Sequence, residues 1–217
     1  MTPPQTLVLP EQADWKVRVV PNLYPALERQ EVVVHSRRHI RSIAEAAGDE
    51  LELVAEAWRR RAADEPGYVF PLLNEGHDAG ASLAHSHSQL VWLPEPPALR
   101  ARPRAETVFE RDELTVACPW ASRMPYETVI TPTEPEPDPL ESAHLAPALK
   151  LLADVVRRLQ RLEGQVPLNA WLERGPDDWR LVLFPRLNIL AGLELGAGIF
   201  VNTVPPEEAA VRLREAS

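Results

Sequence analysis

The chain has 217 residues, a formal net charge of -9 at pH 7 and hydrophobic residues at 45% of its positions. This length can bury a core either as one large domain or as two half-size units packed on each other. The longest apolar stretches fall far short of the roughly 20 residues that cross a bilayer. The acidic balance also disfavours adhesion to nucleic acid or to an anionic membrane. We therefore expect a soluble protein with no nucleic-acid partner and no membrane partner.

Cysteine usage and the N-terminus predict a cytoplasmic location. Cys118 is the only cysteine, so the chain forms no internal disulfide and no cysteine-based metal site. Residues 1–10 lack the basic start, the apolar core and the small-residue cleavage site of a secretory signal. Both features fit a reducing compartment.

The first part of the chain alternates short strands with one helix. Period-two alternation and apolar runs predict strands at 15–20, 31–34, 68–73 and 85–92. Apolar residues at helical spacing predict a helix over 48–63, which Pro66 and Gly67 end.

The second part repeats this order. Strands are predicted at 114–117, 128–130, 168–172 and 179–184, with a helix over 140–162. A glycine-rich turn, a short strand at 199–202 and a helix opened by Pro205 and Pro206 follow. We interpret the chain as a degenerate internal duplication, with halves at 1–98 and 106–217. The expected fold class is α+β: each half is an antiparallel sheet with a helix, and the two sheets join or pack face to face.

The most informative stretch runs from Asn74 to Gln89 and contains a His-x-His-x-Gln pattern. On a strand, alternation places His85, His87 and Gln89 on one face. A neutral imidazole keeps a lone pair on one ring nitrogen and can attack phosphorus. His87 is therefore the candidate nucleophile.

A glycine-containing loop precedes this strand. Gly80, Ala81 and Ser82 allow backbone N–H groups to approach a phosphate, and Ser82 can add a hydroxyl donor. Gln89 cannot activate water as a third imidazole could, but its amide can donate to phosphate oxygens. The pattern predicts a covalent intermediate that waits for an acceptor phosphate and is not rapidly hydrolysed.

Two other interpretations of the histidines stay open. His-x-His on a strand also occurs among metal ligands, although the first following carboxylate is Glu95, beyond the strand. The pair can also be purely structural.

The stretch resembles the active-site segment of the galactose-1-phosphate uridylyltransferase family of the histidine-triad superfamily. That family's pattern is an asparagine, a glycine loop ending in serine, and His-Pro-His-x-Gln. Its counterparts here are Asn74, Gly80, Ser82, His85, His87 and Gln89. The similarity extends to the segments VRVVPNLYPAL and AGLELGAGIFVNTVPPEEAA.

The resemblance implies roles for the matched residues. His87 would carry the nucleotidyl group, Gln89 would bind the transferred phosphoryl group, and Asn74 would hold the phosphates. The backbone of Gly80, Ala81 and Ser82 would assist it, and His85 would lie at the nucleotide. Asn22 and Leu23 would lie at the nucleobase and ribose, with an ordinary turn as the alternative for Asn22. Positions near the sugar or second-phosphate pocket of relatives match Glu194, Gly196, Gly198 and Asn202, where a plain glycine turn is the alternative.

The chain departs from the family at a zinc site. Relatives bind zinc through a Cys-x-x-Cys pair, a histidine after the second strand and the first histidine of His-x-His. Both cysteines are absent here, which leaves His39 and His85 as an orphan half-site. Because two ligands rarely hold structural zinc, we expect no metal and no other cofactor, with His85 orienting the strand through a local hydrogen bond. Either the protein dispenses with zinc, or the natural chain begins further upstream and this one is N-terminally shortened.

The family's N-terminal arginines, which reach a neighbouring subunit's phosphates, are also missing, and Arg18, Arg37 or Arg38 are candidates to replace them. The resemblance implies a homodimer. Arg180 is expected to be a surface or interface arginine, and His35 an exposed residue near a strand end.

We expect a ping-pong nucleotidyltransferase. His87 would attack the α-phosphorus of a nucleoside diphosphate sugar, release a sugar phosphate and pass the nucleotidyl group to a phosphate acceptor. Hexose 1-phosphate is the default acceptor, as in UDP-hexose exchange. With inorganic phosphate as acceptor, the same residues would make a nucleotide-sugar or dinucleoside polyphosphate phosphorylase. The contrasting alternative is a non-catalytic nucleotide-binding protein.

Overall fold

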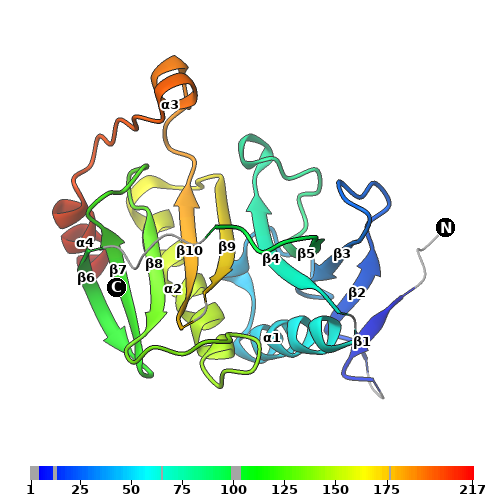
Figure 1. Ribbon diagram of the computed structural model, residues 1–217. Coiled ribbons are helices and arrows are strands. Elements are labelled where there is room, and N and C mark those ends of the chain that lie inside the picture. Colours follow the sequence, from blue (N-terminus) through cyan, green and yellow to red (C-terminus); the bar gives the residue numbers. More distant parts are fainter. Residues whose placement is uncertain (1–4, 12–13, 65, 99–103, 176) are drawn as a thin grey trace.

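One antiparallel sheet runs through the whole molecule (Figure 1). The computed structural model describes residues 5–11, 14–64, 66–98, 104–175 and 177–217. The strands found there are, in chain order, β1 (Leu7–Leu9), β2 (Val17–Pro21), β3 (Gln30–Val34), β4 (Tyr68–Glu75), β5 (His87–Leu93), β6 (Ala105–Arg111), β7 (Leu114–Pro119), β8 (Thr128–Pro132), β9 (Leu168–Arg174) and β10 (Trp179–Pro185). Their order across the sheet is β1-β2-β3-β5-β4-β9-β10-β8-β7-β6.

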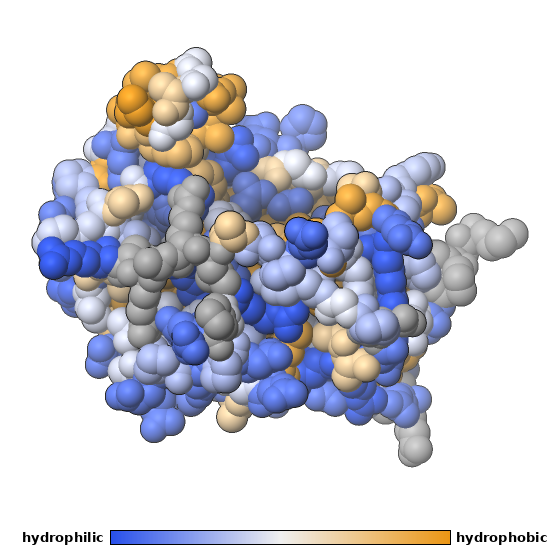
Figure 2. Space-filling view, in the orientation of Figure 1, coloured by the Kyte–Doolittle hydropathy of each residue, from blue (hydrophilic) through white to orange (hydrophobic). Residues whose placement is uncertain are grey.

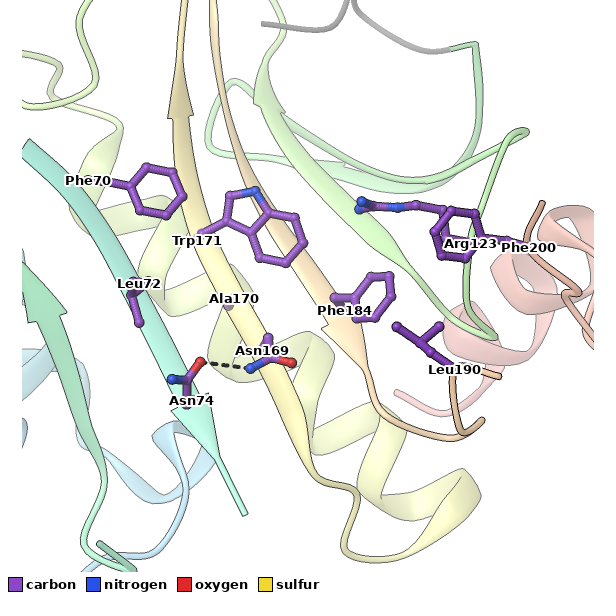
Figure 3. A pocket seen from close by; sticks show the side chains of 10 residues that line it. All are labelled: Phe70, Leu72, Asn74, Arg123, Asn169, Ala170, Trp171, Phe184, Leu190 and Phe200. Carbon is purple, nitrogen blue, oxygen red and sulfur yellow. Dashed lines mark hydrogen bonds between the residues drawn. The ribbon is translucent and has the colours of Figure 1, made fainter. Parts of the chain in front are cut away.

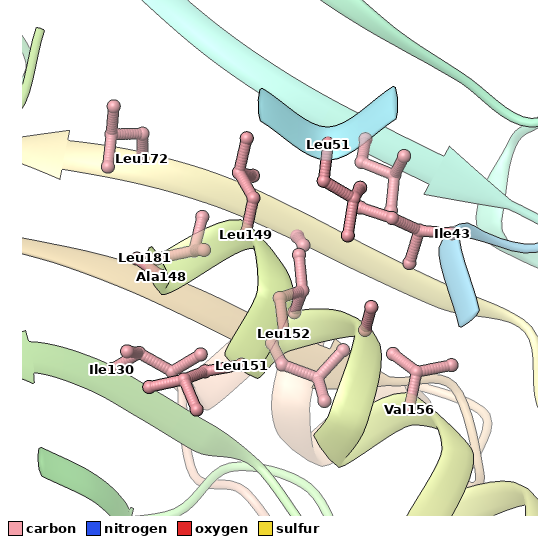
Figure 4. Packing of buried hydrophobic residues seen from close by; sticks show 14 of the residues in the cluster. Ile43, Leu51, Ile130, Ala148, Leu149, Leu151, Leu152, Val156, Leu172 and Leu181 are labelled. Carbon is pink, nitrogen blue, oxygen red and sulfur yellow. The ribbon is translucent and has the colours of Figure 1, made fainter. Parts of the chain in front are cut away.

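The helices are α1 (Gly48–Ala63), α2 (Leu145–Glu163), α3 (Gly192–Ala197) and α4 (Pro206–Glu215), with short 3-10 turns η1 (Ile43–Glu45) and η2 (His77–Ala79). Three of them, α1, α2 and α4, cover one face of the sheet, whereas α3 lies on an arm that projects from it (Figure 1). The apolar sides of α1 and α2 form one continuous core with the strands. Figure 4 shows Leu149 and Leu152 of α2 in this core together with Leu172 of β9 and Leu181 of β10. Among the described residues, no helix has the length and apolar character needed to cross a membrane.

The two ends of the sheet mirror each other. Each half of the chain contributes three strands, a long helix and two further strands, and the halves meet where β4 pairs with β9. The predicted α+β class is therefore confirmed, and the two sheets join edge to edge. The strand order is consistent with a duplication, and the division at 1–98 and 106–217 remains our interpretation.

The register decides which side chains face the helices. Trp58 of α1 donates its indole N–H to the Ser88 hydroxyl at 2.9 Å, so Ser88 points toward α1. Because neighbouring residues of a strand point to opposite faces, His87 and Gln89 point to the face opposite α1. We call this face, opposite α1 and α2, the open face.

Several elements agree with the sequence analysis. The first helix has the predicted bounds. The second begins at Leu145 and not at Leu140, because Pro147 is tolerated only in the first turn of a helix. The expected strand at 199–202 does not form, since this segment lies on the arm around α3, above the sheet and beside no strand (Figure 1). Strands β1 and β6 were not predicted.

Candidate functional site

The tautomer of His87 follows from one hydrogen bond. Its Nδ1 lies 2.8 Å from the carbonyl oxygen of His85. A carbonyl oxygen only accepts, so Nδ1 carries the proton and Nε2 keeps its lone pair. The residue is 5% exposed, which shields the ring from bulk water. The neutral ring of His87 is thus held in the tautomer that a nucleophilic imidazole needs.

His85 lies just before the strand that carries His87. The strand β5 begins at His87, two residues later than predicted, so only His87 and Gln89 of the three predicted residues belong to the strand. His85 instead donates from Nε2 to the carbonyl oxygen of Ser36 at 2.9 Å. Its Nδ1 lies 3.2 Å from Nδ1 of His39. The backbone carbonyl of His85, and not its ring, is what contacts His87.

The orphan half-site is brought together but does not fit a structural zinc ion. His39 and His85 supply two nitrogen donors, whereas structural zinc takes four ligands. Over the described part of the chain, no cluster of three His, Cys, Asp or Glu side chains could hold a metal ion.

Two amides lie beside His87 on the open face. Gln89 on β5 pairs with Leu72 on β4, and the next pairs along the strands bring Asn74 opposite His87. Asn74 Oδ1 accepts from Nδ2 of Asn169 at 2.7 Å (Figure 3). Gln89 Oε1 accepts from Nε2 of Gln30.

Sequence reasoning missed Asn169 and Gln30. Asn169 lies on β9, directly paired with Asn74 across the junction of the two halves. Only a prediction of that long-range register could have found it. Gln30 lies on β3, the strand beside that of Gln89, and its place just before the strand predicted at 31–34 was the only local signal.

The glycine loop uses part of its backbone internally. Gly80 has φ 83°, in the left-handed region that favours glycine. The N–H groups of Gly80 and Ala81 donate to the carbonyl oxygens of His77 and Gly76, at 2.9 and 3.2 Å. These two N–H groups are therefore occupied, contrary to the expectation that they cradle a phosphate. Ser82 is exposed, and its hydroxyl meets no partner among the described residues.

The predicted nucleoside residues lie in the loop between β2 and β3. The Asn22 side chain accepts from the N–H of Tyr24 at 3.0 Å, which is an ordinary turn contact. Leu23 is exposed. The loop leads into Gln30, so it is linked to Gln89 through the amide pair.

The hydrogen bonds of the tail residues Glu194 and Asn202 are local and do not include His87. Glu194 accepts from the N–H of Ala191 at 2.9 Å as a helix cap, and Asn202 accepts from the N–H of Val204 at 3.1 Å. Gly198 ends α3 with φ 66°. Within the described residues, neither Glu194 nor Asn202 contacts His87 through a hydrogen bond.

An aromatic cavity opens beside Asn74 on the open face (Figure 3). Its volume is about 380 Å³. The guanidinium of Arg123 lies 5.6 Å from the ring centroid of Trp171 and 4.9 Å from that of Phe184. The residues that line it are Phe70, Leu72, Asn74, Arg123, Asn169, Ala170, Trp171, Phe184, Leu190 and Phe200. This cavity was not predicted from the sequence.

A buried polar network lies behind the nucleophile strand. His35 is fully buried and not exposed as expected, because it follows β3 toward the helix face. Its Nδ1 lies 3.0 Å from the Ser86 hydroxyl, which donates to Glu75 at 3.3 Å. Burial, and then the neighbouring His87 and His85, lower the pKa of His35 to about 3. Burial raises the pKa of the Glu75 carboxyl to about 7.

The candidate arginines are engaged elsewhere. Arg18 stacks over the Trp15 ring at 4.4 Å. Arg37 pairs with Asp14 at 3.0 Å, and Arg38 pairs with Glu50 at 2.8 Å. None of these contacts includes a residue of the His87 site of the same chain, and a role of these arginines toward a neighbouring subunit's phosphates stays a prediction.

Arg180 corrects another expectation. It is buried on the open face of β10 and bonds to the carboxylate of Glu173. It is therefore not a surface arginine of this chain.

Known proteins resemble the chain over almost its whole length, although no family model matches it. ADP-glucose phosphorylase of Arabidopsis thaliana is 25% identical, in a match that covers 94% of this chain and 75% of that protein. Galactose-1-phosphate uridylyltransferase of Thermotoga maritima is 26% identical, covering 85% of this chain and 73% of that protein.

Solved structures share the fold. The GalT-like protein of Arabidopsis thaliana superposes with a TM-score of 0.90 at 24% identity, covering 100% of this chain and 89% of that chain. A uridylyltransferase superposes with a TM-score of 0.80 at 23% identity, covering 94% and 87%. The chain is thus similar in sequence to an ADP-glucose phosphorylase and to a galactose-1-phosphate uridylyltransferase, and it has the fold of the GalT-like protein.

Proposed function

We propose that the protein is a nucleotidyltransferase that acts on a nucleoside diphosphate sugar through a covalent nucleotidyl group on His87. The observation that carries the proposal is the bond from His87 Nδ1 to the carbonyl of His85, which leaves Nε2 as a lone-pair donor. The names of two relatives, an ADP-glucose phosphorylase and a galactose-1-phosphate uridylyltransferase, support the substrate class.

The reaction is a displacement at phosphorus in which no atom changes its oxidation state. His87 Nε2 attacks the α-phosphorus, a P–N bond forms, and the bond to the bridging oxygen breaks, so that a sugar phosphate leaves with the electron pair. The imidazole becomes positively charged, and the carbonyl of His85 stabilises that charge through Nδ1–H. An oxygen of an acceptor phosphate then attacks phosphorus and breaks the P–N bond.

Three features support slow loss of the intermediate to water. His87 is almost fully shielded. Gln89 cannot act as a general base toward water. The amides of Gln89 and Asn74 are placed to donate hydrogen bonds to the phosphoryl oxygens.

The nucleoside is assigned to the loop that holds Asn22 and Leu23.

A homodimer belongs to the same proposal. The arm around α3 carries apolar side chains that face solvent, including Ile189 at 91% and Leu195 at 73% exposure. Figure 2 shows them as a hydrophobic cluster that projects from the molecule. A second copy that covers this arm would remove these side chains from water. Glu194 and Gly196 lie on the same arm, so they would lie at this interface. Leu195→Glu is expected to give monomers in light scattering.

The acceptor distinguishes the alternatives. With hexose 1-phosphate the protein exchanges UDP-hexoses; with inorganic phosphate it is a nucleotide-sugar or dinucleoside polyphosphate phosphorylase. The ADP-glucose phosphorylase similarity favours testing phosphate first. We also place the protein in the cytoplasm, which the free and buried Cys118 supports.

Intact-protein mass tests the proposal directly. Wild type is incubated with UDP-glucose, UDP-galactose, ADP-glucose or a dinucleoside polyphosphate, beside His87→Ala and the control His77→Ala, whose side chain is 99% exposed. A nucleotidyl mass on wild type and on the control, but not on His87→Ala, is expected and identifies the base. Addition of glucose 1-phosphate or inorganic phosphate then identifies the acceptor that removes it. Binding without any adduct would show a nucleotide-binding protein instead.

A further inference from the structure

Both amides beside His87 have their carbonyl oxygens occupied by a second amide. Asn169 donates to Asn74 Oδ1, and Gln30 donates to Gln89 Oε1. These four residues come from four strands: β4, β9, β3 and β5. The arrangement recurs on either side of the nucleophile, at the pairings β4–β9 and β3–β5.

A backbone group fixes the orientation of each donating amide. Asn169 Nδ2 also donates to the carbonyl oxygen of Ala79 at 2.8 Å, and a carbonyl oxygen can only accept. Gln30 Oε1 accepts from the N–H of Ala26 at 2.8 Å, and an N–H can only donate. Neither amide can turn over without placing two like groups against each other.

The fixed orientation of Asn169 and Gln30 also fixes the orientation of Asn74 and Gln89. Since Asn74 and Gln89 accept through their oxygens, their NH2 groups stay available. Across the described residues, neither NH2 group donates to a protein acceptor. Figure 3 shows the Asn74 nitrogen turned away from Asn169. Beside His87 the two amides are thus oriented as donors, the polarity that an anionic phosphate requires.

We propose that Asn169 and Gln30 are positioning residues that hold Asn74 and Gln89 with their NH2 groups toward the phosphates of the substrate. The inference rests on the proposed function, because it assigns the two phosphate-binding amides their orientation. Asn169 and Gln30 do not themselves touch the reacting atoms. Their role is to prevent the carbonyl oxygens of Asn74 and Gln89 from facing a phosphate oxygen.

Variants that reverse polarity separate this role from packing. In Gln30→Glu a carboxylate faces Gln89 and can only accept, so Gln89 turns its NH2 toward it and its oxygen toward the phosphate. Gln30→Met has a similar length and imposes no polarity. The rate of nucleotidyl-His87 formation with ADP-glucose and UDP-glucose is expected to fall about 10- to 100-fold in Gln30→Glu and by a smaller factor in Gln30→Met. A purely structural role predicts equal losses in the two variants.

Asn169→Asp provides a second readout through pH. The introduced carboxyl cannot donate when ionised but can donate to Asn74 when protonated. Its rate relative to wild type should therefore recover as the pH falls toward about 4, where an aspartate carboxyl takes up its proton, whereas the ratio for Asn169→Ala should stay flat. Melting temperatures of all variants are compared, and the Gln30 pair decides the question if the Asn169 variants fail to fold.

The outcomes distinguish this inference from the proposed function. If wild type forms an adduct and Gln30→Glu forms it as fast as Gln30→Met, the positioning role is wrong while the proposed function stands. If wild type forms no adduct with either nucleotide sugar, the proposed function fails first. A Gln30→Glu loss larger than that of Gln30→Met, with matched melting temperatures, establishes the positioning role.

Discussion

His39 and His85 face each other through their Nδ1 atoms, which lie 3.2 Å apart although 46 residues separate them in the chain. His85 donates from Nε2 to the carbonyl of Ser36, so its Nδ1 has a lone pair and accepts from His39. The pair is complete as a hydrogen bond and offers a metal only two ligands. This hydrogen bond orients the segment before β5.

The first prediction concerns metal removal. EDTA is expected to leave the melting temperature and adduct formation unchanged, and elemental analysis should find less than one zinc per chain. The control is His39→Ala, which should lower the melting temperature equally with and without EDTA. Stoichiometric zinc that His39→Ala abolishes would contradict this prediction.

The second prediction concerns the link between α1 and the nucleophile strand. Trp58→Phe leaves the Ser88 hydroxyl buried without its donor, and Ser88→Ala leaves the indole N–H buried without its acceptor. Each change should lower the free energy of unfolding by about 1–3 kcal/mol. Urea unfolding of the double variant should show a loss about 1 kcal/mol smaller than the summed single losses. Additive losses would show that the two side chains are not coupled.

The third prediction is that Glu75 weakens the fold as the pH rises. Its pKa is raised to about 7 by burial, whereas the unfolded carboxyl titrates near 4.5. Between these values the folded protein holds a proton that the unfolded chain has lost, so stability falls with increasing pH. Glu75→Gln keeps an acceptor and cannot ionise. Between pH 4.5 and 8, the free energy of unfolding of the variant should rise relative to that of wild type by about 3 kcal/mol. A difference between the two proteins that does not change with pH would refute this prediction.

The fourth prediction is the opposite trend for His35. Its pKa is lowered to about 3 by burial and by the neighbouring His87 and His85, whereas the unfolded imidazole titrates near 6.5. The unfolded chain therefore takes up a proton first, and the stability present above pH 6.5 is lost as the pH falls toward 3. His35→Phe fills the same buried site without a titrating group. Urea unfolding at pH 7 and pH 4.5 should show a smaller loss of stability in His35→Phe than in wild type, and an equal loss would contradict the assignment.

Local sequence was sufficient for elements whose signal lies within a few residues. The helix over 48–63 has one apolar side and a Pro-Gly stop, and its predicted bounds agree with α1. Alternation identified most strands of the sheet within a few residues, and it identified His87 and Gln89 as residues of one face. The failures are also local: β5 begins after His85, and the segment at 199–202 finds no strand to pair with.

By itself, the sequence determined the fold class, the repeated order of elements and the nucleophile candidate, because each depends on residue type and spacing along one strand or helix. Only the tertiary structure decided that β4 pairs with β9, that Asn169 holds Asn74 from 95 residues away, and that His35 is buried. The physical reason is that periodicity records which face of an element is apolar. It does not record which distant strand will pair with that element, or which polar side chain that strand will contribute.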